Sequence, residues 1–272
     1  MLHSNSVEKL KLDRSKQKAF GYLAKDIDRS DLKTNIIPMQ IRDEIPTMNR
    51  MGFMKIDLDQ FSKEFINIGA NTNDFILEIG CAYGFIVQNV LKSSGKIIAS
   101  DLSIEHLSVL LQNTPEELLH NLYLYPGSFP SEINFQSESL RAVLASRILH
   151  FLDGPTIEIG LNKIHNWLKP KGKLFFIAVT PYHAAIREGF LETYKKRVIN
   201  GEKWPGVIEN QWEINPNHKE FVEPYLHVFD IPLLQTLLPK HGFEIDKINL
   251  FDYPKDTDSG GKGHVGLIAT KI

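Results

Sequence analysis

The chain has 272 residues, of which 42% are hydrophobic and 24% charged, and its formal net charge is -2. This length and composition are typical of one α/β domain, alone or with a modest appendage. The small net charge gives no reason to expect a nucleic-acid partner, because such proteins usually carry a basic surface. No apolar run approaches the roughly 20 residues that cross a bilayer, so no membrane partner is expected.

The sequence holds one cysteine, Cys81, which excludes an internal disulfide and a cysteine-rich zinc site. The first residues lead into a segment rich in Lys and Asp, without the apolar centre of a signal peptide. We therefore expect a reduced, cytoplasmic setting. The sequence leaves the oligomeric state open.

The N-terminal stretch, residues 1–72, is polar and mixed until apolar residues begin to recur at helical spacing. Leu58, Phe61 and Phe65 follow this spacing, and Asp57 or Asp59 can cap the start of the helix. We expect residues 1–72 to form a helical segment beside the main domain.

From residue 73 onward, short apolar runs alternate with amphipathic stretches. Strands are predicted at residues 75–79, 96–100, 122–125, 141–146, 173–179, 243–250 and 264–271. Helices are predicted at residues 85–91, 103–111, 157–168 and 233–238. This alternation favours an α/β fold with a doubly wound, mostly parallel, seven-stranded sheet that ends in an antiparallel hairpin.

Residues 181–229 interrupt the alternation. The stretch combines aromatic residues, among them Trp204 and Trp212, with many charged residues. We interpret it as an insertion over the edge of the sheet rather than as an independent domain.

The strongest chemical signal is a strand and turn over residues 75–84, followed by Asp101 at the end of the next strand. Small residues at the carboxyl end of a strand let the backbone approach a nucleotide-like ligand, and the next helix presents free N–H groups. A carboxylate about 20 residues further on can accept both hydroxyls of a ribose. The turn and the acid together predict a nucleoside site.

Here the chain resembles the class I (Rossmann-like) S-adenosylmethionine (SAM)-dependent methyltransferases. Their first motif, an acid followed by a glycine-rich loop, is similar to residues 78–84, with Ala82 in place of the usual second glycine. Their second motif, a strand that ends in an acid, is similar to residues 97–103, and their turn before the fifth strand to residues 168–174. The resemblance covers residues 74–179 well and the rest only in layout.

The resemblance implies SAM as cofactor, with S-adenosylhomocysteine (SAH) as product. Asp101 would bind the ribose, Leu102 would pack on the adenine, and Ser128 would reach the adenine amine. The full set of residues implied for the cofactor is Glu78, Gly80, Cys81, Ala82, Gly84, Asp101, Leu102, Ser128 and Ser146. Cys81 is expected to serve there as a small packing residue.

Methyl transfer to an oxygen or nitrogen can require a general base. His150 follows the fourth strand, and Tyr182 and His183 follow the fifth, so these three are the candidate catalytic residues. Residues 48–54 and the insertion at 181–229 could cover an acceptor pocket, with residues 1–72 capping the active site of a SAM-binding domain at 73–272. Grouped aromatic residues favour a small-molecule acceptor.

Two other functions compete with this prediction. A non-catalytic, regulatory SAM-binding module would share the cofactor motifs. An NAD(P)-dependent dehydrogenase would share the layout, but the turn lacks the G-x-G-x-x-G pattern. The motif of base-methylating enzymes is absent, since residues 145–148 read Ala-Ser-Arg-Ile, which argues against base flipping. No counterpart of the magnesium ligands of catechol-type enzymes is found, so no metal is expected.

Overall fold

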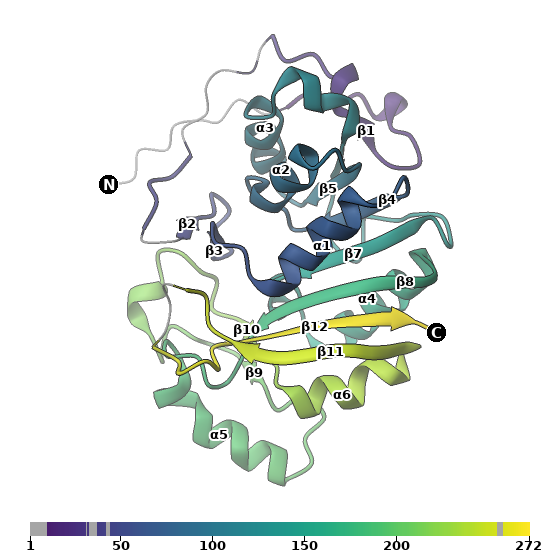
Figure 1. Ribbon diagram of the computed structural model, residues 1–272. Helices are drawn as coiled ribbons and strands as arrows, with labels where there is room; N and C mark the ends of the chain where they lie inside the picture. The colour runs from purple at the N-terminus through teal and green to yellow at the C-terminus, as the bar shows by residue number, and fades with distance from the viewer. Residues whose placement is uncertain (1–9, 31, 33–36, 42–43, 255–257) are drawn as a thin grey trace.

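The computed structural model describes residues 10–30, 32, 37–41, 44–254 and 258–272, so parts of the predicted N-terminal segment lie outside the described residues. An eight-stranded mixed sheet runs through the molecule (Figure 1). Its strands, from one edge to the other, are β1 (Tyr22–Leu23), β6 (Leu122–Pro126), β5 (Ile97–Asp101), β4 (Phe75–Ile79), β7 (Leu140–Ser146), β8 (Leu168–Val179), β12 (His264–Lys271) and β11 (Phe243–Phe251).

Strands β6, β5, β4, β7 and β8 are parallel, and β12 and β11 continue the sheet as an antiparallel hairpin. The predicted α/β, doubly wound, seven-stranded sheet is therefore confirmed. The eighth strand is the two-residue β1 of the N-terminal segment, which pairs antiparallel with β6.

Helices cover both faces of the sheet. On one face lie α1 (Gln60–Ala70), α2 (Phe85–Lys92) and α3 (Ile104–Gln112), and on the other lie α4 (Gly154–Trp167) and α6 (Ile231–Lys240). Successive side chains of β4 point to opposite faces of the sheet, which explains the two layers of helices. Ile76 packs into the core beneath α1, α2 and α3, whereas Leu77 and Ile79 pack into the core beneath α4 and α6. Each core is fully buried at its centre.

The helix predicted near the end of the N-terminal segment is α1, and Asp59 caps it by accepting hydrogen bonds from two backbone N–H groups. Before Gln60, the described residues contain no α-helix. They form the 3-10 helices η1 (Arg14–Lys16) and η2 (Ala24–Asp26), strand β1 and a hairpin of β2 (Glu44–Pro46) and β3 (Phe53–Lys55). Prolines and polar residues without helical periodicity account for this difference from the predicted helical segment.

The insertion at 181–229 contains α5 (Arg187–Ile199), a small hairpin of β9 (Val207–Ile208) and β10 (Leu226–His227), and the 3-10 helix η5 (Pro216–His218). It has a small apolar core of its own, which includes Phe190, Tyr194 and Val228. Two further 3-10 helices, η3 (Glu116–Asn121) and η4 (Leu149–Phe151), lie in connections of the main sheet. No helix among the described residues is both long and apolar enough to span a bilayer.

Strand β8 begins earlier than predicted. Leu168 already pairs with Leu140, and the register then shifts before Ala142 pairs with Lys173. The sequence from 169 to 172, Lys-Pro-Lys-Gly, forms this irregular start instead of a separate turn.

Candidate active site

The order of the parallel strands reverses between β4 and β7, and the first of two cavities opens at the carboxyl ends of these strands. Such a switch point is where open α/β sheets usually bind their ligands. The first cavity has an empty volume of about 1050 Å³, and many of its lining residues lie at or just after the carboxyl ends of β4, β5, β6 and β7. Eight of the nine predicted cofactor residues line it: Glu78, Gly80, Cys81, Ala82, Asp101, Leu102, Ser128 and Ser146. The ninth, Gly84, is the N-cap of α2 and does not line the first cavity.

The loop after β4 approaches the cavity with its backbone. Gly80 has φ +71°, and a Cβ at that position would lie 2.2 Å from Cγ2 of Ile148. The Gly80 and Cys81 N–H groups donate to the Ser100 carbonyl, which fixes the loop over the end of β5. Ala82 has φ +45°, a conformation that favours glycine, so the second-glycine position of the motif keeps its backbone geometry despite the substitution.

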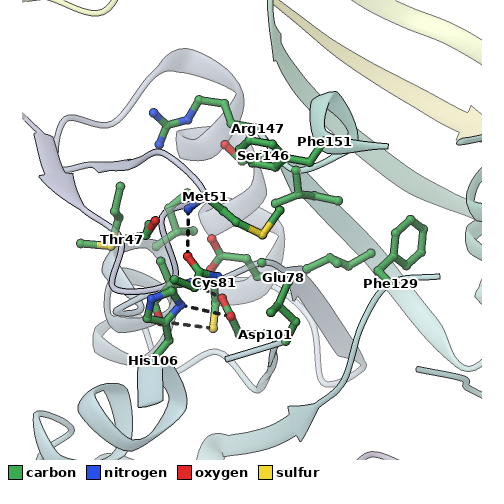
Figure 2. Close-up of a pocket in the computed structure, with 18 of the residues that line it drawn as sticks. Thr47, Met51, Glu78, Cys81, Asp101, His106, Phe129, Ser146, Arg147 and Phe151 are labelled. Atoms are coloured by element: carbon green, nitrogen blue, oxygen red, sulfur yellow. Dashed lines mark hydrogen bonds and ion pairs between the residues drawn. The ribbon is translucent and has the colours of Figure 1, made fainter. Parts of the chain in front are cut away.

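Asp101 connects this loop to helix α3. Its Oδ2 accepts a hydrogen bond of 2.8 Å from the Ala82 N–H, and its Oδ1 accepts one of 2.8 Å from the Ser103 N–H. His106 Nδ1 lies 3.1 Å from the same Oδ1 (Figure 2). Each carboxylate oxygen can accept more than one hydrogen bond, so Oδ2 keeps capacity for a ligand hydroxyl.

Glu78 brings an unsatisfied carboxyl oxygen to the first cavity. Its Oε2 is buried and has no hydrogen-bond partner. Burial, and then the negative charge of Asp101, raise the pKa of Glu78 to about 8, against smaller lowering effects of the Val87 N–H and the Arg147 charge. A cationic group beside this carboxyl would restore its ionised form.

The remaining predicted residues differ in what they offer a ligand. Leu102 is 53% exposed and so presents a large apolar side chain at the cavity. The Ser128 N–H is occupied by Glu132 Oε2 at 2.7 Å. Burial, together with the charges of Asp101 and Glu78, raises the pKa of the Cys81 thiol, which fits a packing residue.

The β2–β3 hairpin of the N-terminal segment forms another wall of the first cavity. Thr47 and Met51, from the turn of this hairpin, face the cluster of Glu78, Cys81 and Asp101 in Figure 2. Tyr83 holds the hairpin in place, since its Oη donates a hydrogen bond of 2.8 Å to the Pro46 carbonyl.

A second cavity, with an empty volume of about 1760 Å³, adjoins the first. Hairpin residues, the segment after β7 and the insertion at 181–229 line it, the insertion through residues such as Ile186, Gln211, Phe221 and Leu226. Five residues are common to the linings of both cavities: Met51, Phe53, Lys55, Arg147 and Phe151.

The three predicted catalytic residues do not come together. His150 and His183 line the second cavity, whereas Tyr182 lines neither cavity. Burial, and then the positive charges of Arg147 and His227, lower the pKa of His150 to about 3. His150 therefore stays neutral near pH 7 and is a weak base, suited to hydrogen bonding. Burial and the charge of Asp230 raise the pKa of Tyr182.

Several polar residues of the cavities were not predicted from the sequence, among them Lys55, His106 and Arg147. His106 lies one turn into the helix after Asp101, a spacing that could have been noticed. Lys55 and Arg147 are brought in by the hairpin and by the turn after β7, and no local pattern marks them. Among the described residues, no group of three His, Cys, Asp or Glu side chains is arranged to hold a metal ion.

Comparisons with known proteins agree with this geometry. Residues 76–172 match the family model described as a methyltransferase domain. No curated protein gives a match. Many solved structures share the fold at low sequence identity, so their likeness concerns the fold alone.

One such structure is a SAM-dependent methyltransferase from Methanosarcina mazei, with a TM-score of 0.59, 20% identity and coverage of 79% of this chain and 99% of that one. Another, from Mesorhizobium loti, has a TM-score of 0.56, 13% identity and coverage of 78% and 98%. The 1,6-didemethyltoxoflavin-N1-methyltransferase from Burkholderia thailandensis has a TM-score of 0.55, 14% identity and coverage of 78% and 77%. The family match over residues 76–172, the order of the strands and the motif residues around one cavity identify a methyltransferase domain with a Rossmann-like fold in this chain.

Proposed function

We propose that this methyltransferase binds SAM in the first cavity and transfers its methyl group to an oxygen or nitrogen atom of a small molecule bound in the second cavity. The observation that carries the proposal is the shared wall, since five residues line both cavities. A methyl group can then pass between two ligands that lie against the same side chains.

The residues of the first cavity fit SAM. The exposed face of Leu102 suits a flat, apolar adenine, and the free acceptor capacity of Asp101 suits the ribose hydroxyls. The orphaned Glu78 Oε2 suits the cationic methionine end of the ligand.

When bound, SAM supplies an electrophilic methyl group on a positively charged sulfur. The chain contributes mainly alignment and exclusion of water. Phe53, Phe151 and Met51 at the shared wall are apolar, so they would desolvate the acceptor atom, and the phenyl rings of Phe53 and Phe151 offer no nucleophilic atom that would compete with it. His150 would hydrogen-bond the acceptor, and His183, also in the second cavity, is the proposed proton acceptor.

A small-molecule acceptor fits the mixed apolar and polar lining of the second cavity. Residues 184–186 and several residues between 211 and 226 form its outer wall, so we propose that the insertion at 181–229 is an acceptor-binding lid. The N-terminal segment would cap the site from the other side through its β2–β3 hairpin. The Burkholderia methyltransferase of similar fold has 1,6-didemethyltoxoflavin and SAH bound together, which is consistent with two adjoining ligands.

Calorimetric titration with SAH and with NAD tests the proposal. SAH should bind and NAD should not. Replacing Asp101 by Asn should weaken SAH binding by about tenfold or more, because hydrogen bonds to a charged group contribute about 1.5–3 kcal/mol. Asp246→Asn, in a partly exposed ion pair with Lys173, is the matched control and should leave SAH affinity unchanged. Absence of SAH binding to the wild-type chain would refute the proposal.

A further inference from the structure

Arg147 is an unpaired cation at the boundary of the two cavities. Its Nε is buried without a hydrogen-bond partner, and its guanidinium forms no ion pair with any residue that the structure describes. Its Cζ lies 5.5 Å from the centre of the Tyr253 ring, which leaves the hydrogen-bonding edge of the guanidinium unused.

The other charges around the second cavity do not neutralise Arg147. Lys55 is paired with Glu44, at 2.7 Å. Asp258, the other lining carboxylate, is exposed at the rim. Arg147 is therefore a positive charge without an ion-pair partner among the described residues that line the second cavity. The same charge contributes to the lowered pKa of two nearby histidines, His150 and His264.

The position of Arg147 directs this charge toward the acceptor side. Arg147 follows β7 with φ +56°, an unusual conformation for a residue with a side chain, and its N–H is fixed by the Ile177 carbonyl at 2.7 Å. In Figure 2 its guanidinium extends away from Glu78 and Asp101, the residues that surround the first cavity. Arg147 also lines the second cavity.

We propose that the methyl acceptor carries a carboxylate, and that Arg147 binds this carboxylate in the second cavity. This inference rests on the proposed function. The planar guanidinium matches a carboxylate through two parallel hydrogen bonds, and neutral imidazole of His150 adds a further polar contact. The apolar side chains Phe53, Phe151 and Phe221 would enclose the rest of such a molecule.

SAM has a carboxylate as well, so the test must separate the two sources. The chain saturated with SAH is titrated, by ligand-observed NMR, with a panel of small carboxylates, each paired with its uncharged amide, for example benzoate with benzamide and phenylacetate with phenylacetamide. SAH and 5′-methylthioadenosine, which lacks the amino-acid part, are titrated into the unliganded chain.

At least one carboxylate should bind more tightly than its amide. Arg147→Met should weaken binding of that carboxylate by about tenfold or more and leave the affinity for the amide unchanged. Arg147→Lys should retain part of the affinity, because it keeps the charge and loses the planar fork. Arg141→Met, at the opposite end of the same strand, removes an equal charge and should change the affinity for neither ligand.

Three results would overturn the inference. The first is that no carboxylate binds better than its amide. The second is that Arg147→Met weakens binding of the carboxylate and of its amide equally, which would indicate a packing role. The third is that Arg147→Met weakens binding of SAH but not of 5′-methylthioadenosine, which would assign Arg147 to the carboxylate of the cofactor. In all three, SAH binding by the wild-type chain would leave the proposed function standing.

Discussion

Replacing Gly80 by alanine places a methyl group where the structure leaves no room. Gly80 has φ +71°, and the new Cβ would lie 2.2 Å from Cγ2 of Ile148. Gly201 provides a matched control, because its φ is +72° and no atom lies within 4 Å of the place that a Cβ would occupy there. The two alanine variants therefore share the backbone cost and differ only in the contact.

The left-handed conformation costs a residue with a side chain roughly 1–2 kcal/mol, which is the expected loss for Gly201→Ala. Overpacking against Ile148 adds typically about 1–3 kcal/mol in Gly80→Ala. In a chain of this size, each kcal/mol lowers the Tm by roughly 2–4 °C. The double variant Gly80→Ala, Ile148→Ala removes the clash, so the destabilisation by overpacking should disappear. It adds the separate cost of truncating the Ile148 side chain.

Thermal unfolding of the wild type, Gly80→Ala and Gly201→Ala measures the excess, and titration with SAH measures its effect on the site. Gly80→Ala should weaken SAH binding, because the loop that lines the first cavity must shift, whereas Gly201→Ala should not. Equal Tm values for the two variants, or unchanged SAH affinity in Gly80→Ala, would refute the close-approach argument.

Two further predictions concern Glu78 and Tyr83. Because the pKa of Glu78 is raised to about 8 from 4.5, folding favours the protonated form, so the contribution of Glu78 to stability is full below about pH 4.5 and is lost as the pH rises through 8. The Tm of the unliganded wild type relative to Glu78→Gln should therefore fall across that window, and a pH-independent difference would contradict the assignment. Tyr83→Phe removes the 2.8 Å hydrogen bond to the Pro46 carbonyl and should cost about 1 kcal/mol of stability and weaken SAH binding several-fold. Unchanged SAH affinity in calorimetry would mean that the β2–β3 hairpin is held without this bond.

The sequence predicted the parts of the fold that depend on local patterns. The five parallel strands and the final hairpin are rich in apolar residues, and the Asp59 cap follows from a side chain that binds the first N–H groups of a helix. The first cavity could also be predicted from the sequence, because its motif residues lie at the carboxyl ends of strands or just after them. Parallel strands bring those ends to one edge of the sheet.

The sequence could not predict features that depend on contacts between distant segments. Strand β1 has two residues, too few for an alternation, and exists because it pairs with β6. The second cavity combines the hairpin near residue 50, the turn at Arg147 and the insertion past residue 181. No spacing along the chain records their proximity. Tyr182 illustrates the limit, since it is adjacent to His183 and yet lines neither cavity.

The five residues common to the two cavities have a thermodynamic consequence. Met51, Phe53 and Lys55 belong to one short hairpin, so any motion of the hairpin that the first ligand restricts is already restricted when the second ligand binds. The entropy of ordering the hairpin is then lost only once. By linkage, the factor by which one ligand strengthens binding of the other must be equal in both directions. We therefore expect the two substrates to bind cooperatively rather than independently.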